Sequence, residues 1–502
     1  MDGINSLATG LAVALTAQNL ACAFAGCLLG ILSGVLPGLG AAAAIAILLP
    51  WVHALDATPA LIVLAGVFCG VQHGGGIRAI LGHVPGTSPS AVSAIEGHPL
   101  ALQGRAGAAL AVAALGAWFA GCLGTAFIAS VAPLLSNLAL GFGPAERFAL
   151  MVLALIGAVV VASGSRLKSL AMAVLGLLLS MVGADALSGT PRLSLGVPEL
   201  SGGISFVVLA VGLFALSDVI DQLAHPTGQH KAITGDVSGL WLSRKDAHEA
   251  GPAVLRGTAL GLLMGLLPGV AALRASWASY AMEKRLAGAR GRFGKGDLRG
   301  VAGPESARCA GAQTSFIALL ALGIPLNAVM ALLMGALLIK GSQPGPQWIG
   351  SQPSLWWGLI ASMGIGQLML LMINVPLVGV WIRLLAVPYR HVFAAVTLLC
   401  CIGVYALRGS AFDVGLMAGF AAAGYALRQL GCDLVPLLLG FVLGPQMEGQ
   451  LRGALALSQG EWGTFVSHPL SASLLAAAAL LLVAVFLPST SRERRAAFHD
   501  AD

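Results

Sequence analysis

Charged residues are scarce in this sequence. Asp, Glu, Lys and Arg make up 10% of the 502 residues, whereas apolar residues make up 57%. A soluble domain carries roughly 25% charged residues, so this chain lacks the polar shell that a soluble protein of its size needs. Its surface must therefore face lipid, which excludes a soluble fold and predicts a multi-pass membrane protein.

Several functional motifs are also missing. No Lys or Arg precedes Arg78, so we expect no cleavable signal peptide, because such peptides begin with a basic segment. The eight cysteines show no CxxC spacing, which favours packed thiols over a metal site or a disulfide framework. The HExxH, GxSxG and P-loop motifs are absent, which argues against an intramembrane enzyme and against an ATP-driven pump.

The apolar residues form continuous runs, not the alternating pattern of a membrane β-barrel. Each run approaches or exceeds the ~20 residues that cross a bilayer as a helix. The sequence therefore predicts an all-α polytopic fold with about 12 transmembrane segments. We place them at 18–50, 58–72, 107–133, 145–163, 168–187, 203–222, 253–280, 312–339, 355–383, 386–406, 411–428, 433–446 and 471–487.

One polar segment of mixed charge divides these runs into two groups. It covers residues 225–256 and is the best candidate for a linker. We therefore expect a first transmembrane repeat at 1–224, a second at 257–488 and a tail at 489–502.

Two Leu-Pro-Gly strings interrupt apolar runs at matching places in these groups. Pro37-Gly38 lies in GILSGVLPG, and Pro268-Gly269 lies in GLLMGLLPG. A second landmark follows each string, with Pro85 in AILGHVPG and Pro325 in LLALGIPL. Chance similarity between apolar segments is the alternative, but two landmarks in the same order favour an internal duplication.

Charge indicates how the two repeats are oriented. Residues 282–300, after the second string, hold six Lys or Arg and two acids, which predicts a cytoplasmic loop. The corresponding residues 51–60 hold no Lys or Arg, so the two loops are expected on opposite sides and the repeats are expected to be inverted. The basic tail places the C-terminus in the cytoplasm. Inverted repeats with interrupted helices are typical of secondary transporters, although one isolated string could be a simple proline kink.

Several longer strings resemble the large permease subunit of the bacterial tripartite tricarboxylate transporters, the TctA family, from about residue 10 to residue 485. They include GVLPGLGAAAAIAILLP, EGHPLALQGRAGAALAVAALGAW, FGKGDLRGVAGPESA, ALGIPLNAVMALLMGALLIKGSQPGP and VPLLLGFVLGPQMEGQLRGALALSQG. The resemblance implies Na⁺- or H⁺-driven import of a small organic anion, a citrate-like di- or tricarboxylate, across the bacterial inner membrane. It also implies two partners, a small TctB-like membrane subunit and a periplasmic TctC-like solute-binding protein, and no organic cofactor.

The chain departs from the family near the breaks. Where the family reads YGGSTTAILLNIPGE, residues 73–87 read HGGGIRAILGHVPGT, which introduces Arg78. Where the family reads APESANNA, residues 303–310 read GPESARCA, which introduces Arg308, and Arg274 follows the second Leu-Pro-Gly string. These changes remove hydroxyl and amide oxygens, the ligands that a hard cation prefers.

The breaks and their neighbours form the predicted substrate and ion site. Its candidate residues are Pro37, Gly38, Gly40, Gly74, Gly75, Arg78, His83, Pro85, Gly86, Pro268, Gly269, Arg274, Ser276, Pro304, Glu305, Ser306, Arg308, Gly323, Pro325 and Asn327. Oxygens of four of these are candidate Na⁺ ligands: Gly38, Gly269, Ser306 and Asn327.

Each ionisable candidate has more than one interpretation. The three arginines could bind an anionic substrate or replace the charge of a cation, or they could lie at the water interface. Glu305 could pair with an arginine, carry a coupling proton or cap a helix. His73 and His83 could titrate near neutral pH or only pack. The alternative function is a transport-inactive or sensory relative that binds solute, or a binding protein, without flux.

Overall fold

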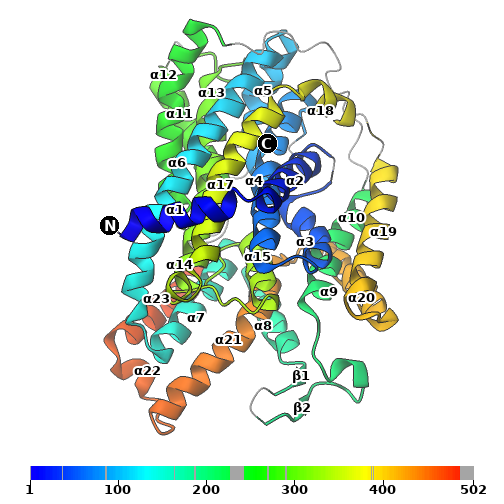
Figure 1. Ribbon diagram of the computed structural model, residues 1–502, viewed down its shortest axis with the longest axis vertical. Helices are drawn as coiled ribbons and strands as arrows, with labels where there is room; N and C mark the ends of the chain where they lie inside the picture. Colours follow the sequence, from blue (N-terminus) through cyan, green and yellow to red (C-terminus); the bar gives the residue numbers. More distant parts are fainter. Residues whose placement is uncertain are drawn as a thin grey trace.

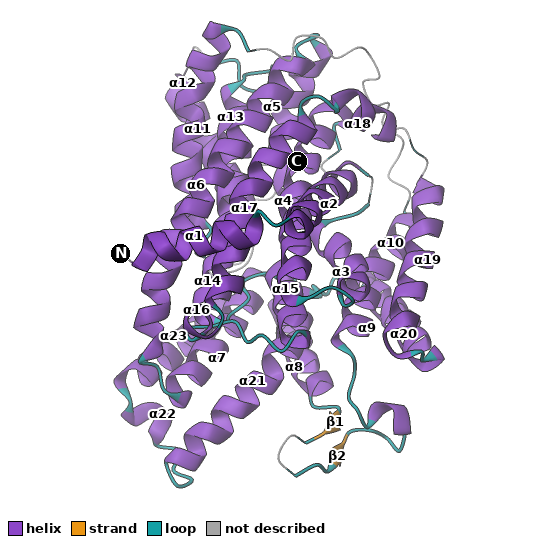
Figure 2. Ribbon diagram, in the orientation of Figure 1, coloured by secondary structure: helices purple, strands orange, loops and turns teal. Residues whose placement is uncertain are grey.

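The fold is almost entirely helical, as the sequence predicts (Figures 1 and 2). The computed structural model describes residues 2–36, 38–84, 87–162, 164–185, 188–225, 242–267, 271–288, 291–385, 387 and 389–486. One small exception to the helical fold is an antiparallel ribbon of two-residue strands, β1 (Gly183–Ala184) and β2 (Pro191–Arg192).

Helices make up most of the described chain. The first part of the chain forms α1 (Asp2–Ala14), α2 (Ala17–Val35), α3 (Ala41–Val52), α4 (Ala57–Gly82), η1 (Ser88–Ser90), α5 (Ala91–Leu102), α6 (Ala106–Leu140), α7 (Pro144–Val161), α8 (Arg166–Ser180), η2 (Pro198–Leu200), α9 (Phe206–Ala210), η3 (Val211–Leu216) and α10 (Ser217–Ala224). The second part forms α11 (Arg244–Met264), α12 (Ala271–Ala287), α13 (Arg299–Thr314), α14 (Phe316–Leu322), α15 (Ala328–Ile339), α16 (Trp348–Ser351), α17 (Pro353–Asn374), α18 (Val378–Leu385), α19 (Tyr389–Arg408), α20 (Ala411–Gln429), α21 (Val435–Leu457), α22 (Thr464–Ser467) and α23 (Pro469–Phe486).

Seven helices of the described residues are long and apolar enough to cross a membrane, fewer than the predicted segments. They are Ala17–Val35, Ala57–Gly82, Ala106–Leu140, Pro144–Val161, Phe206–Ala224, Pro353–Asn374 and His391–Arg408. Three of the predicted segments are divided between shorter helices, as expected for the two that contain a Leu-Pro-Gly string, because proline and glycine interrupt helical hydrogen bonding. These segments are 18–50, 253–280 and 312–339.

Part of the predicted linker is helical. Helix α11 begins at Arg244, where the Ser243 side chain accepts a hydrogen bond from the Asp246 backbone N–H and caps the helix. Residues 226–241 lie outside the described residues, as does the tail at 489–502.

Glycines bring α2 and α4 into direct backbone contact. Gly26, Gly30 and Gly34 recur every fourth residue and so share one face of α2. A Cβ added to Gly30 would lie only 2.4 Å from the carbonyl oxygen of Val67 on α4, and Gly26 and Gly34 are equally tight. Small residues permit this close approach, on which helix packing in membranes depends.

The same arrangement joins α11 and α13. Gly257, Gly261 and Gly265 recur at the same spacing, and a Cβ on Gly261 would lie 2.3 Å from the carbonyl oxygen of Ala307. Both glycine stripes end next to a Leu-Pro-Gly string, since α2 is followed by Pro37 and α11 by Pro268. The two interrupted helices therefore pack in the same way, each against a helix that contributes to the site described below.

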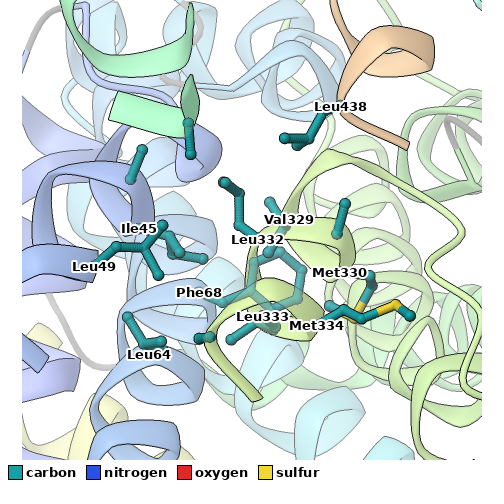
Figure 3. Packing of buried hydrophobic residues seen from close by; sticks show 14 of the residues in the cluster. Ile45, Leu49, Leu64, Phe68, Val329, Met330, Leu332, Leu333, Met334 and Leu438 are labelled. Carbon is teal, nitrogen blue, oxygen red and sulfur yellow. The ribbon is translucent and has the colours of Figure 1, made fainter. Parts of the chain in front are cut away.

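The main apolar core joins α3 and α4 to α15, α17 and α21 of the second half of the chain. Figure 3 shows Ile45 of α3 and Phe68 of α4 near Leu332 and Met330 of α15, with Leu438 of α21 close by. Helix α15, which lies near the centre of the molecule in Figure 1, thus packs against α3, α4 and α21 through apolar residues. The core therefore fixes the position of α15, which follows Pro325.

We predict that Gly30→Ala destabilises the protein by about 1–3 kcal/mol, because the new methyl group must push α2 away from α4. Thermal unfolding of the purified protein in detergent measures the effect. Gly415→Ala on α20 is the matched control, since a Cβ there meets nothing within 4 Å. Equal melting temperatures for the two variants would contradict the direct backbone contact.

Candidate functional site

The first Leu-Pro-Gly string separates α2 from α3. Helix α2 is capped at its C-terminal end by Leu36, Gly38 has a left-handed backbone with φ of +85°, and α3 begins after Gly40. Gly40 supplies no side-chain cap, so the first N–H groups of α3 have no side-chain partner at that position. Pro37 lies outside the described residues.

The second string separates α11 from α12, and Pro268 and Gly269 lie outside the described residues. On α12, the buried hydroxyl of Ser276 donates to the carbonyl oxygen of Pro304, at 3.2 Å. Pro304 cannot donate a backbone hydrogen bond, and its own carbonyl is satisfied by this contact between two helices. Arg274, on the same helix, has an exposed side chain.

The second pair of landmarks also shares a backbone feature. His83 ends α4 with φ of 52°, and Gly323 ends α14 with φ of 70°. Each of these left-handed residues stands two positions before a proline, Pro85 or Pro325. The His83 side chain is exposed and its ring lies 4.6 Å from that of His98, whereas Pro325 is buried; Pro85 and Gly86 lie outside the described residues.

A buried ion pair occupies the middle of α13. Glu305 and Arg308 have exposed fractions of 1% and 0%, and Nη2 of Arg308 donates to Oε2 of Glu305. The hydroxyl of Ser93 on α5 donates to the other carboxylate oxygen. Two donors therefore satisfy the carboxylate, as a charge at this depth requires.

The other end of the guanidinium contacts α4. Nη1 of Arg308 donates to the backbone carbonyl of Gln72 at 2.5 Å and to its side-chain oxygen at 3.1 Å. Gly76, one turn further along α4, leaves room for the pair, because a Cβ there would lie 3.0 Å from Oε2 of Glu305. The pair thus links the two halves of the chain.

A small hollow lies beside the pair, between α4, α6, α13 and the end of α17. Its volume of about 20 Å³ is enough for one water molecule. His73 and Asn374 contribute to its lining, and Nε2 of His73 and Oδ1 of Asn374 have no hydrogen-bond partner among the described residues. Since Nδ1 of His73 lies 3.0 Å from the carbonyl oxygen of Cys69, it carries the proton of the neutral ring, and Nε2 is an acceptor.

Arg78 lies at the first break. Its side chain on α4 is 8% exposed, and Nη1 donates to the carbonyl oxygen of Leu36 at 3.4 Å. Leu36 immediately precedes Pro37, so the guanidinium reaches a carbonyl at the interrupted end of α2. In the part of the chain that the structure describes, Arg78 forms no ion pair with a carboxylate.

The candidate sodium ligands have separate partners in this structure. The Ser306 hydroxyl donates to the Ala302 carbonyl within α13, and the Asn327 side chain caps α15 by accepting from the Met330 backbone N–H. Gly38 lies against the Gln222 side chain. Gly74 packs against α2, while Gly75 faces Thr87. No hydrogen bond among the described residues joins Gly38, Ser306 and Asn327.

A sequence model described as the tripartite tricarboxylate transporter TctA family matches residues 20–439. The chain belongs to the TctA family. It is thus a large permease subunit of the tripartite tricarboxylate transporters, a family of transporters and not of enzymes.

Two proteins of Agrobacterium vitis are similar to this TctA chain. An "Uncharacterized 52.8 kDa protein in TAR-I ttuC' 3'region" is 46% identical over 502 residues, which cover both chains completely. An "Uncharacterized protein in TAR-II ttuC' 3'region" is 47% identical over 242 residues, which are 48% of this chain and all of that protein. No solved structure matches the chain significantly.

A second buried carboxylate, not predicted from the sequence, joins the two halves of the TctA chain. Glu96 on α5 is 0% exposed and accepts hydrogen bonds from the Tyr280 hydroxyl at 2.8 Å and from the backbone N–H groups of Gly294, Gly296 and Asp297. These three N–H groups belong to the loop between α12 and α13. Glu96 lies in the EGHP string and its three backbone donors lie in the FGKGD string, but neither string indicates that the two are in contact.

The neighbouring Asp297 stabilises the same loop. Burial raises the pKa of Asp297, but hydrogen bonds from Arg299 and from the backbone N–H of Arg292 outweigh it, and the pKa lies below its usual value. The carboxylate is therefore charged at neutral pH and holds Arg299 at 2.7 Å. The loop that connects α12 to α13 is thus fixed by two carboxylates.

We predict that Glu96→Ala loosens this loop, because it leaves several buried N–H groups without an acceptor, at about 1–3 kcal/mol each. Limited proteolysis in detergent, with cleavage mapped to residues 288–298, measures the loosening. Tyr280→Phe removes one donor and keeps the carboxylate, so its cleavage rate should stay close to that of the unmodified protein. If Glu96→Ala were as resistant as Tyr280→Phe, the anchoring role of Glu96 would be wrong.

Proposed function

We propose that this TctA chain imports a small organic anion, a citrate-like di- or tricarboxylate, by secondary active transport. It works in the bacterial inner membrane with a small TctB-like subunit and receives its substrate from a periplasmic TctC-like binding protein. The gradient of Na⁺ or H⁺ drives import, and no organic cofactor is needed. The loop at 282–300 and the C-terminus face the cytoplasm.

The proposal includes two inverted repeats, within which about 12 segments lie in the membrane. The repeated packing supports it, because each interrupted helix uses glycines every fourth residue to contact the second helix after it. The left-handed residues before Pro85 and Pro325 support it further. Binding sites of transporters typically lie at interrupted helices that occupy matching positions in two halves of the chain.

The observation that carries the substrate assignment is the buried guanidinium of Arg78. It lies beside the C-terminal end of α2 and has no carboxylate partner among the described residues. A carboxylate of the substrate would supply the missing counter-charge through a bidentate contact. The N–H groups at the start of α3, after the first break, add to the attraction for an anion.

The proposed cycle requires a conformational change. The hollow beside α13 is about 20 Å³, which is too small for a tricarboxylate, and Arg78 does not line it. We propose that the repeats move against each other to expose Arg78 first to the periplasm and then to the cytoplasm. The tight pairs α2–α4 and α11–α13 move as units, because glycine contacts hold each pair together.

Uptake of labelled citrate into proteoliposomes tests the assignment, using the complete tripartite assembly under an imposed Na⁺ or H⁺ gradient. We predict that Arg78→Gln weakens substrate affinity roughly 10–100-fold, since it removes a charge-assisted contact. Arg78→Lys should retain part of the affinity because it keeps the charge. Arg408→Gln, an exposed arginine at the end of α19, is the matched control and should transport normally.

Two results would contradict the proposal. Unchanged affinity of Arg78→Gln would remove Arg78 from the substrate site. Binding without flux under both gradients would replace the carrier by the alternative, a relative that senses solute or binding protein.

A further inference from the structure

Arg308 lies where a bound cation would otherwise be needed. The Glu305 carboxylate is buried in α13, and Ser93 supplies only a neutral donor to it. A carboxylate at this depth needs a positive charge, a proton or a metal ion. The guanidinium of Arg308, which is itself 0% exposed, supplies that charge from within the same helix.

The oxygen atoms around the guanidinium are the kind that hold a hard cation. They are a carboxylate oxygen of Glu305, the backbone carbonyl of Gln72 and the side-chain amide oxygen of Gln72. Such oxygens also coordinate Na⁺ or a divalent cation. No group of three or more His, Cys, Asp or Glu side chains that could hold a metal occurs among the described residues. The position is therefore rich in oxygen and already occupied by a covalently attached cation.

The geometry argues against substrate binding by Arg308. Its charge is neutralised by Glu305, and both of its terminal nitrogens donate to protein oxygens. An anion would have to displace Glu305 and strand a carboxylate in the core, which is costly. Arg78, in contrast, forms no such pair in the part of the chain that the structure describes.

We propose that Arg308 is a tethered cation that takes the place of a bound metal ion between Glu305 and Gln72. This carrier then needs no Na⁺ at this position. The inference rests on the proposed function in one respect only. Because Arg308 already occupies this position, the ion that drives transport must bind at another position. The assignment of the position itself concerns α4, α5 and α13 alone.

Thermal unfolding of the purified full-length chain in detergent tests the proposal. Unfolding is followed in NaCl and in choline chloride at equal ionic strength, for the unmodified protein, Glu305→Gln, Arg308→Met and the double variant Glu305→Gln/Arg308→Met. The unmodified protein should melt at the same temperature in both salts. Arg308→Met should melt several degrees lower in choline chloride and regain most of the loss in NaCl.

The double variant is the matched control. It removes both charges, so it should melt above Arg308→Met in choline chloride and show no response to Na⁺. If Arg308→Met does not fold, Arg308→Lys keeps a tethered charge and should melt equally in both salts. The double variant then still tests the proposal. If it folds where Arg308→Met does not, Arg308 is needed to neutralise Glu305; if it also fails to fold, the proposal is contradicted.

Two further outcomes overturn the proposal. One is a saturable Na⁺-dependent stabilisation of the unmodified protein that disappears in Glu305→Gln, because a metal ion would then bind beside Glu305 despite Arg308. The other is an Arg308→Met variant that folds and does not respond to Na⁺. Neither measurement uses substrate, flux or the binding protein, so a failure here is distinct from a failure of the transport proposal.

Discussion

Direct backbone contact between glycine-bearing helices is the constraint on which the rest of the structure depends. Gly30 on α2 and Gly261 on α11 leave no space for a side chain, so each helix lies against its partner at the closest possible distance. This packing holds α4 and α13 beside the two breaks and lets Gln72 reach Arg308. Because lipid gives no hydrophobic driving force between helices, such close packing and the buried polar contacts determine the arrangement.

Charge balance is the second theme of the molecule. Glu305 is neutralised by Arg308 on the same helix and also accepts a hydrogen bond from Ser93 of α5. Glu96 of α5 is held by backbone N–H groups of a loop, so both carboxylates join helix α5 to the second half of the chain. Arg78 differs, because it reaches only the carbonyl of Leu36 among the described residues. The two arginines are equally unusual in sequence, but their contacts differ. Arg308 is therefore assigned to the scaffold and Arg78 to the proposed substrate site.

The sequence predicts the features that proline and glycine control locally. The helical class, the division of the segments at 18–50 and 253–280, and the family follow from apolar runs and motifs that are contiguous in the chain. The partners of the Glu305–Arg308 pair could not be predicted, since Gln72 bonds Arg308 and Ser93 bonds Glu305 from more than 200 residues away, and they meet only through helix rotation and packing. For the same reason the exposure of Arg274 and His83 emerges only in three dimensions.

The most direct test of this account is an experimental structure of the complete transporter with a bound carboxylate. We predict that a substrate carboxylate lies within hydrogen-bond distance of the Arg78 guanidinium, beside the first break, while the Glu305–Arg308 pair stays closed without a metal ion. A substrate bound to Arg308, with Glu305 released and Arg78 facing lipid, would contradict it.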